Sequence, residues 1–121
     1  MVNPSSRMLQ TIPFFQSLSP EELEALATNM WIENYRRGEP LAGRRAEDLT
    51  RYRETAWFVY QGVVSLYTLT SRGGRNILFF LGPGALLNQD ILHGGGQILA
   101  EAAADALLIE QVNQSFEKGM E

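Results

Sequence analysis

The feature that most constrains the fold is a change of pattern at Met30. From there on, short segments rich in β-branched and aromatic residues alternate with turns that contain glycine. No long helix is expected between these segments, and strands at such spacing indicate a sandwich, roll or barrel. The predicted strands are Met30–Tyr35, Glu39–Ala42, Ala56–Tyr60, Val63–Leu69 and Asn76–Leu81, with two or three more from about Leu99 to Val112.

The segment before Met30 has the features of an amphipathic helix. Ser19 is suited to the N-cap, Pro20 to the first helical position, and Glu22 completes a capping box. Leu23 and Leu26 then fall on one face, which we expect to pack against the rest of the domain. Two weaker helices are also predicted, one containing Met8, Leu9 and Ile12 and a short one from about Asn113 containing Phe116 and Met120.

Composition excludes several classes of site. The 121 residues suffice for one domain, 1–121, and they include no cysteine, which rules out disulfides, iron–sulfur clusters and thiolate zinc sites. His93 is the single histidine, so neither a histidine-cluster metal site nor a serine–histidine triad is expected. No apolar run approaches the ~20 residues of a membrane span, and the first ten residues do not resemble a signal peptide. We therefore expect a cytoplasmic protein without a membrane partner.

The charges are unevenly distributed. The net charge of −4 argues against direct binding of nucleic acid. Nine of the ten lysines and arginines lie between Arg7 and Arg75, and there is none from Asn76 to Glu117, where five acidic residues lie. That half cannot hold an anion by ion pairing. The charged stretch Arg44–Glu54 is expected to be a surface loop, with a docking surface for a partner as the alternative.

Five segments stand out along the chain: Ile12–Phe15, Leu18–Leu23, Tyr35–Glu39, Trp57–Tyr67 and Phe80–Gly84. In the same order and at nearly the same spacing, they resemble the cyclic-nucleotide-binding domain of the Crp/Fnr transcription regulators. The resemblance covers about residues 10 to 120. It implies a mainly β fold, namely an eight-stranded antiparallel double-stranded β-helix, or jelly roll, with short flanking helices and an effector pocket inside.

The resemblance also implies a regulatory role and no enzyme activity. In such regulators a long dimer helix follows the sensor domain, and a helix-turn-helix domain then binds DNA. Both are absent from this chain. We expect a sensor domain cut from a longer, homodimeric regulator, which reaches DNA only through the missing C-terminal domain. A natural stand-alone module is the alternative.

The effector pocket departs from the pattern of the family. There, a Gly-Glu pair binds the ribose hydroxyl, and a later arginine neutralises the cyclic phosphate. Here Asn88 and Gln89 match the Gly-Glu pair, and residues 94–99 contain no arginine. Because burying a phosphate without a cation costs several kcal/mol, the expected effector is a small, largely apolar molecule with one or two polar groups. Its candidate contacts are Leu86, Leu87, Asn88, Gln89, Asp90, Ile91, Gly94 and Gly95.

Other interpretations stay open. Backbone amides of Gly94–Gly96 could form a nest for the phosphate of a cyclic nucleotide, or the pocket could be vestigial, with its leucines filling a structural roll. No cofactor is expected. His93 could ligate haem, but a lone histidine in a glycine-rich loop is more often a solvated turn residue. A cupin-type enzyme would need several histidines. Cyclic-nucleotide modules of channels or kinases share the fold but usually keep the arginine.

Overall fold

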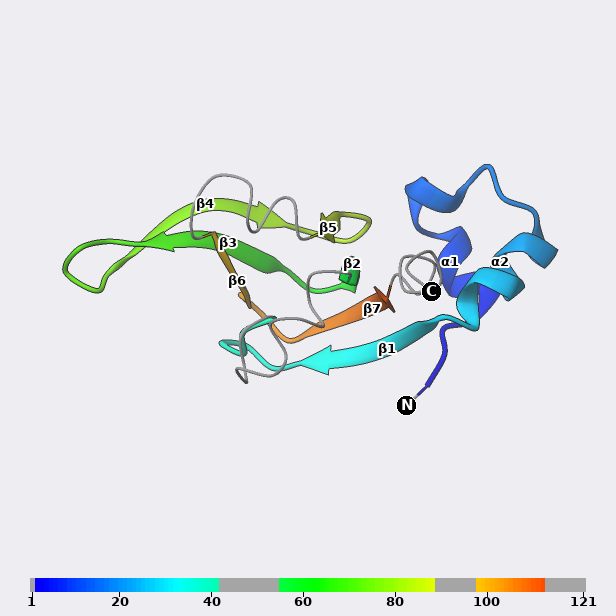
Figure 1. The fold of residues 1–121 in the computed structure, drawn as a ribbon, viewed down its shortest axis with the longest axis horizontal. Helices are drawn as coiled ribbons and strands as arrows, with labels where there is room; N and C mark the ends of the chain where they lie inside the picture. Colours follow the sequence, from blue (N-terminus) through cyan, green and yellow to red (C-terminus); the bar gives the residue numbers. More distant parts are fainter. Residues whose placement is uncertain (1, 42–54, 89–97, 113–121) are drawn as a thin grey trace, which may run out of the picture.

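The computed structural model describes residues 2–41, 55–88 and 98–112. Three short helical segments come first: α1 (Ser6–Gln10), the 3-10 helix η1 (Pro13–Phe15) and α2 (Pro20–Ala27). Seven strands follow in the described residues: β1 (Met30–Tyr35), β2 (Thr55–Gln61), β3 (Val64–Leu69), β4 (Arg75–Leu81), β5 (Leu86–Asn88), β6 (Leu99–Ala102) and β7 (Ala106–Val112). Figure 1 shows the helices at one end of the molecule and the β3–β4 hairpin projecting at the other. The chain is therefore mainly β, as the pattern after Met30 predicts.

The strands form two antiparallel sheets. Sheet A has the order β1-β7-β2-β5, and sheet B has the order β4-β3-β6. Strands that are neighbours in sheet A are far apart in the chain, since β7 lies between β1 and β2. This interleaving is that of the jelly roll implied by the resemblance.

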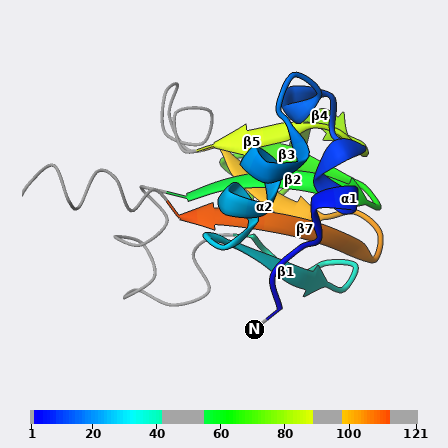
Figure 2. The same ribbon diagram turned by 90° about the vertical axis from the view of Figure 1, so that its right-hand side faces the viewer.

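Alternating side chains of sheet A face two different cores. One core lies between the sheets and includes Trp57, Leu87 and Leu108 from sheet A with Val64 and Leu66 from sheet B. The other lies between sheet A and the helices and includes Phe58 and Ile109 beside residues of the helical segments, Leu9, Ile12, Phe15, Leu23 and Ala27. In Figure 2 the helices lie in front of β2 and β7. Sheet A is thus covered on both faces, which accounts for its nearly continuous apolar strands.

The helix starts follow the predicted chemistry. The Ser19 hydroxyl accepts a bond from the Glu22 N–H at 3.2 Å, and the Glu22 carboxylate accepts one from the Ser19 N–H at 3.0 Å. These two bonds satisfy N–H groups that no helical carbonyl reaches. They also hold the pKa of Glu22 below its ordinary value, chiefly through the bond from the Ser19 backbone. The capping box therefore begins α2 as the sequence predicts.

Two strand predictions need correction. Glu39–Leu41, the described part of the predicted strand Glu39–Ala42, run beside β6 but form only one isolated bridge, Pro40 with Glu101. Pro40 has no N–H to donate, and the backbone bonds on either side go from Leu41 to Ala100 and from Ala102 to Glu39. The short strand β5 was not predicted. The described residues thus hold seven strands and two isolated bridges, at Pro40 and at Val2. The predicted helix from Asn113 and the stretch Arg44–Glu54 lie outside the described residues.

Gly62 makes the passage from sheet A to sheet B possible. Its φ is +91°, a conformation that favours glycine. A Cβ atom on Gly62 would lie 2.5 Å from the carbonyl oxygen of Asp105 and 2.7 Å from Cα of Ala106. The β2–β3 connection therefore packs directly on the turn before β7.

Candidate ligand-binding site

The segment predicted to contact the effector begins as a strand of sheet A. The Gly84 N–H donates to the Val59 carbonyl at 2.7 Å, and the Val59 N–H donates to the Ala85 carbonyl at 2.9 Å. β5 then pairs with β2, with Leu86 opposite Phe58 and Leu87 opposite Trp57. These backbone bonds fix where the segment starts relative to the interior of the roll.

Three of the predicted contact residues can be placed. Leu87 has no exposed surface and packs in the core between the sheets. Leu86 lies on the opposite face of β5 and packs, partly buried, against the helical core. Asn88 is half-buried and pairs with Ala56 in the register. Ligand contact by these residues stays a prediction, and the remaining candidates lie outside the described residues: Gln89, Asp90, Ile91, Gly94 and Gly95, with His93.

An acidic residue lies next to this segment, one strand further along the sheet. Glu110 of β7 pairs with Trp57 of β2 on one side and with Trp31 of β1 on the other. Since directly paired residues share a face, the row Trp31, Glu110, Trp57 and Leu87 faces the interior between the sheets. Glu110 is only 4% exposed. The sequence did not single it out, because in a run such as Leu107–Gln111 an acid gives no local sign of burial.

The described arginines all lie on the surface. Arg7, Arg36, Arg37, Arg72 and Arg75 are each exposed. Arg75 forms an ion pair with Glu101 of β6, and its guanidinium lies 4.7 Å from the centre of the Tyr67 ring. The bond to Glu101 raises the pKa of Arg75. Within residues 2–41, 55–88 and 98–112, the interior therefore contains a carboxylate and no cation.

Two hollows open on the outside of sheet A. One of about 350 Å³ lies between η1 and the end of β2 and includes Thr11, Pro13, Tyr60, Gln61 and Pro83 among its lining residues. The other, of about 280 Å³, lies near the turn after β1, with Arg36 and Asp105 in its lining. Neither is lined by Leu86, Leu87 or Asn88. No group of three or more potential metal ligands occurs among the described residues, and no helix in that part of the chain is long and apolar enough to span a membrane.

Solved structures share this fold. A cyclic nucleotide-binding-like protein from Brucella abortus is 24% identical, with a TM-score of 0.65 over 96% of this chain and 97% of that chain. The sensor domain of the transcriptional regulator DNR from Pseudomonas aeruginosa is 19% identical, with a TM-score of 0.68 over 95% and 75%. A regulatory subunit of a cAMP-independent protein kinase A from Trypanosoma brucei is 16% identical, with a TM-score of 0.69 over 93% of this chain but only 40% of that chain.

Comparison of the sequence with known protein families and curated proteins gives no match. No protein-family model matches it, and no curated protein does. The structural likeness agrees with the roll that the five segments of the Crp/Fnr resemblance imply. The chain has the fold of the cyclic-nucleotide-binding-like domains, which includes sensor domains of transcription regulators.

Proposed function

We propose that this chain is the effector-sensing domain of a Crp/Fnr-type transcription regulator and that its effector is not a cyclic nucleotide. In this role the domain would act in the cytoplasm and would have no enzyme activity. It senses a small molecule, and a homodimeric parent protein transmits the result to DNA through a separate domain. A shift between two arrangements of the roll relative to the following segment is the expected mechanism.

The observation that carries the proposal is the lack of any lysine or arginine from Asn76 to Glu117, the part of the sequence that contains the predicted contact segment. Glu110 is buried on the inward face, beside the Trp57–Leu87 pair at which the predicted contact segment begins. A phosphate buried here would lose its hydration, which costs on the order of several kcal/mol unless a cation compensates it. The nearby sequence offers no compensating cation between Asn76 and Glu117. An uncharged or cationic ligand with an apolar body fits this environment better than a phosphate.

A specific observation supports a second candidate function, that of a structural roll without a ligand. Leu87 is fully buried and Leu86 is packed against the helices. Both leucines therefore stabilise the domain whether or not a ligand binds. In that case the fold would serve only to position its neighbours in a longer protein.

A thermal-shift screen separates these functions. Ligand binding to the folded state alone stabilises it by about 2.7 kcal/mol at a ligand concentration 100 times the dissociation constant. We expect no shift with cyclic AMP or cyclic GMP at millimolar concentration, and a shift with one or more neutral or cationic aromatic compounds. Haem and small aromatic acids complete the panel. Cyclic AMP bound tightly by the unmodified chain would overturn the proposal, and a folded domain that responds to no compound would favour the structural roll.

The variant Glu110→Gln tests the electrostatic argument directly. Removing the buried charge should strengthen any residual affinity for cyclic AMP, measured by titration calorimetry. Glu24→Gln, a change on the exposed face of α2, is the matched control and should leave it unaltered. Thermal unfolding shows whether each variant is folded.

A further inference from the structure

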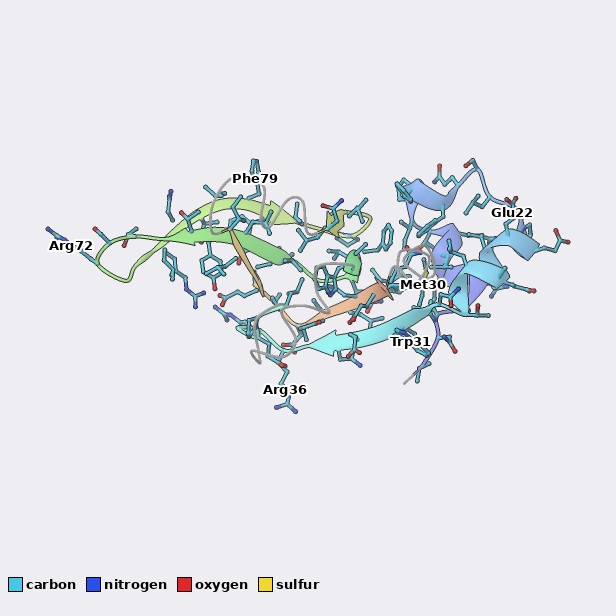
Figure 3. All side chains as sticks on the ribbon, in the orientation of Figure 1. Glu22, Met30, Trp31, Arg36, Arg72 and Phe79 are labelled. Atoms are coloured by element: carbon cyan, nitrogen blue, oxygen red, sulfur yellow. The ribbon has the colours of Figure 1, made fainter. Side chains whose placement is uncertain are left out.

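Strand β4 exposes an unusual amount of apolar surface. Phe79 is 64% exposed and Phe80 is 63% exposed, while Ile77 and Leu78 are 51% and 38% exposed. Figure 3 shows Phe79 projecting from β4 at the rim of the molecule. Contiguous apolar surface of this kind on a domain marks an interaction site.

These side chains lie on both faces of sheet B. Phe79 pairs with Leu66, which belongs to the core between the sheets, whereas Phe80 pairs with Ser65 on the opposite face. An occupant that lay on one face of the sheet would therefore cover one of the two phenylalanines and leave the other in water. An occupant in the plane of the sheet, alongside β4, reaches both.

Within residues 2–41, 55–88 and 98–112, the outer backbone edge of β4 has no strand partner. β4 is at the edge of sheet B, and among the described residues only β3 pairs with it. Edge strands are commonly protected by charged residues, proline or a β-bulge. β4 begins with Arg75, but the rest of the strand, residues 76–81, contains no charge and no proline. A register shift between Leu66 and Tyr67 leaves Leu78 without a direct partner on β3. This bulge increases the local twist without adding charge to the edge.

We infer that β4 pairs with β4 of a second copy of this chain, antiparallel, and joins two copies of sheet B into one continuous sheet. A two-fold axis brings the same apolar edge from each copy together, so both faces are covered at once. The contact goes beyond the proposed sensing function and does not involve the dimer helix that the family resemblance implies.

The alternation of faces selects a register. Ile77 and Tyr67 are paired, as are Phe80 and Ser65. Tyr67 and Ser65 are two residues apart on β3, so Ile77 and Phe80 share a face. Pairing Ile77 with Phe80 of the second copy keeps residues of the same face opposite each other, and it places Leu78 opposite Phe79.

The exposed area indicates a weak dimer. A phenylalanine side chain can bury roughly 150–250 Å², so each exposed ring offers on the order of 100–150 Å². With Ile77 and Leu78 the total is on the order of 400 Å² per copy, about half of the ~800 Å² per partner in a standard stable interface. We expect a dissociation constant on the order of 10–100 μM.

Sedimentation equilibrium of residues 1–121 over a range of concentrations tests the inference. Phe80→Lys and Phe79→Lys should each raise the dissociation constant at least about tenfold, because each puts a charge at the centre of the contact. Phe14→Lys is the matched control: Phe14 is also 64% exposed but lies in η1. Its effect should stay within about twofold. A monomer at about 1 mM, or a dimer that both β4 variants leave intact, would overturn the inference.

Cross-linking tests the register, since the chain has no cysteine of its own. In the double variant Ile77→Cys with Phe80→Cys, the two residues of one strand are about 10 Å apart, too far for a disulfide within one copy. Mild oxidation should therefore give a covalent dimer. The pair Thr68→Cys with Leu69→Cys at the other strand of the hairpin should not. A dimer cross-linked only by the second pair would contradict pairing through β4.

Discussion

Replacing Gly62 by alanine tests the tight connection between the two sheets. The new Cβ would meet two backbone atoms, the Asp105 carbonyl oxygen at 2.5 Å and Cα of Ala106 at 2.7 Å. Neither can rotate away as the end of a side chain could. The turn before β7 or the β2–β3 connection itself must therefore move.

The expected loss of unfolding free energy in Gly62→Ala has two parts. A left-handed backbone conformation costs a residue other than glycine about 1–2 kcal/mol. Forcing extra atoms into a packed site costs about 1–3 kcal/mol more. We expect Gly62→Ala to lower the free energy of unfolding by roughly 2–5 kcal/mol, a large part of the ~5–15 kcal/mol of a typical domain.

Gly73→Ala is the matched control. Gly73 also has a positive φ, +83°, but no atom lies within 4 Å of a Cβ built on it. Gly73→Ala should therefore lower the free energy of unfolding only by the cost of the left-handed backbone conformation, about 1–2 kcal/mol. Urea denaturation followed by tryptophan fluorescence gives both values, because Trp57 is fully buried. Equal losses in the two variants would refute the packing argument.

Three further changes follow from the described contacts. Leu87→Ala should lower the free energy of unfolding by about 2–5 kcal/mol through the cavity it leaves, measured by urea denaturation; a loss below about 1 kcal/mol would show that Leu87 is not core. Ser19→Ala should cost about 1 kcal/mol by removing the cap of α2, and circular dichroism should show less helix. The lowered pKa of Glu22 means that its contribution to stability is present above the usual glutamate pKa of about 4.3 and is lost as the pH falls through the folded value. Glu22→Gln should remove this component of the pH dependence of thermal unfolding, and a pH profile identical to that of the unmodified chain would contradict it.

Local pattern predicted much of the fold. β1 has the predicted bounds, β3 and β4 differ from the prediction by one residue at one end, and β2 is one residue longer at each end. These strands carry enough aromatic and β-branched residues to be recognised without their partners. The capping box of α2 is likewise a local signal, because all of its bonds lie within four residues.

The remaining features depend on partners distant in the chain. β5 is three residues long and exists through its pairing with β2 about 30 residues earlier, which its own sequence does not show. The run Ile77–Leu81 looks like a buried strand, and only the sheet order places it at an edge. In the candidate site, the missing cation is visible in the sequence. The burial of Glu110 is not, since it follows from the register of β7 with β1 and β2.

The position of β2 between β5 and β7 has a mechanical consequence. Neighbouring strands are about 4.8 Å apart, so β5 lies roughly 10 Å from β7 across β2. Only β2 lies between β5 and β7, and its Trp57 pairs with Leu87 on one side and with Glu110 on the other. A sideways push of a fraction of an ångström at β5 reaches β7 without any hinge, since well-packed interiors are stiff. A displacement of β5 would therefore reach β7 across the sheet rather than along the backbone.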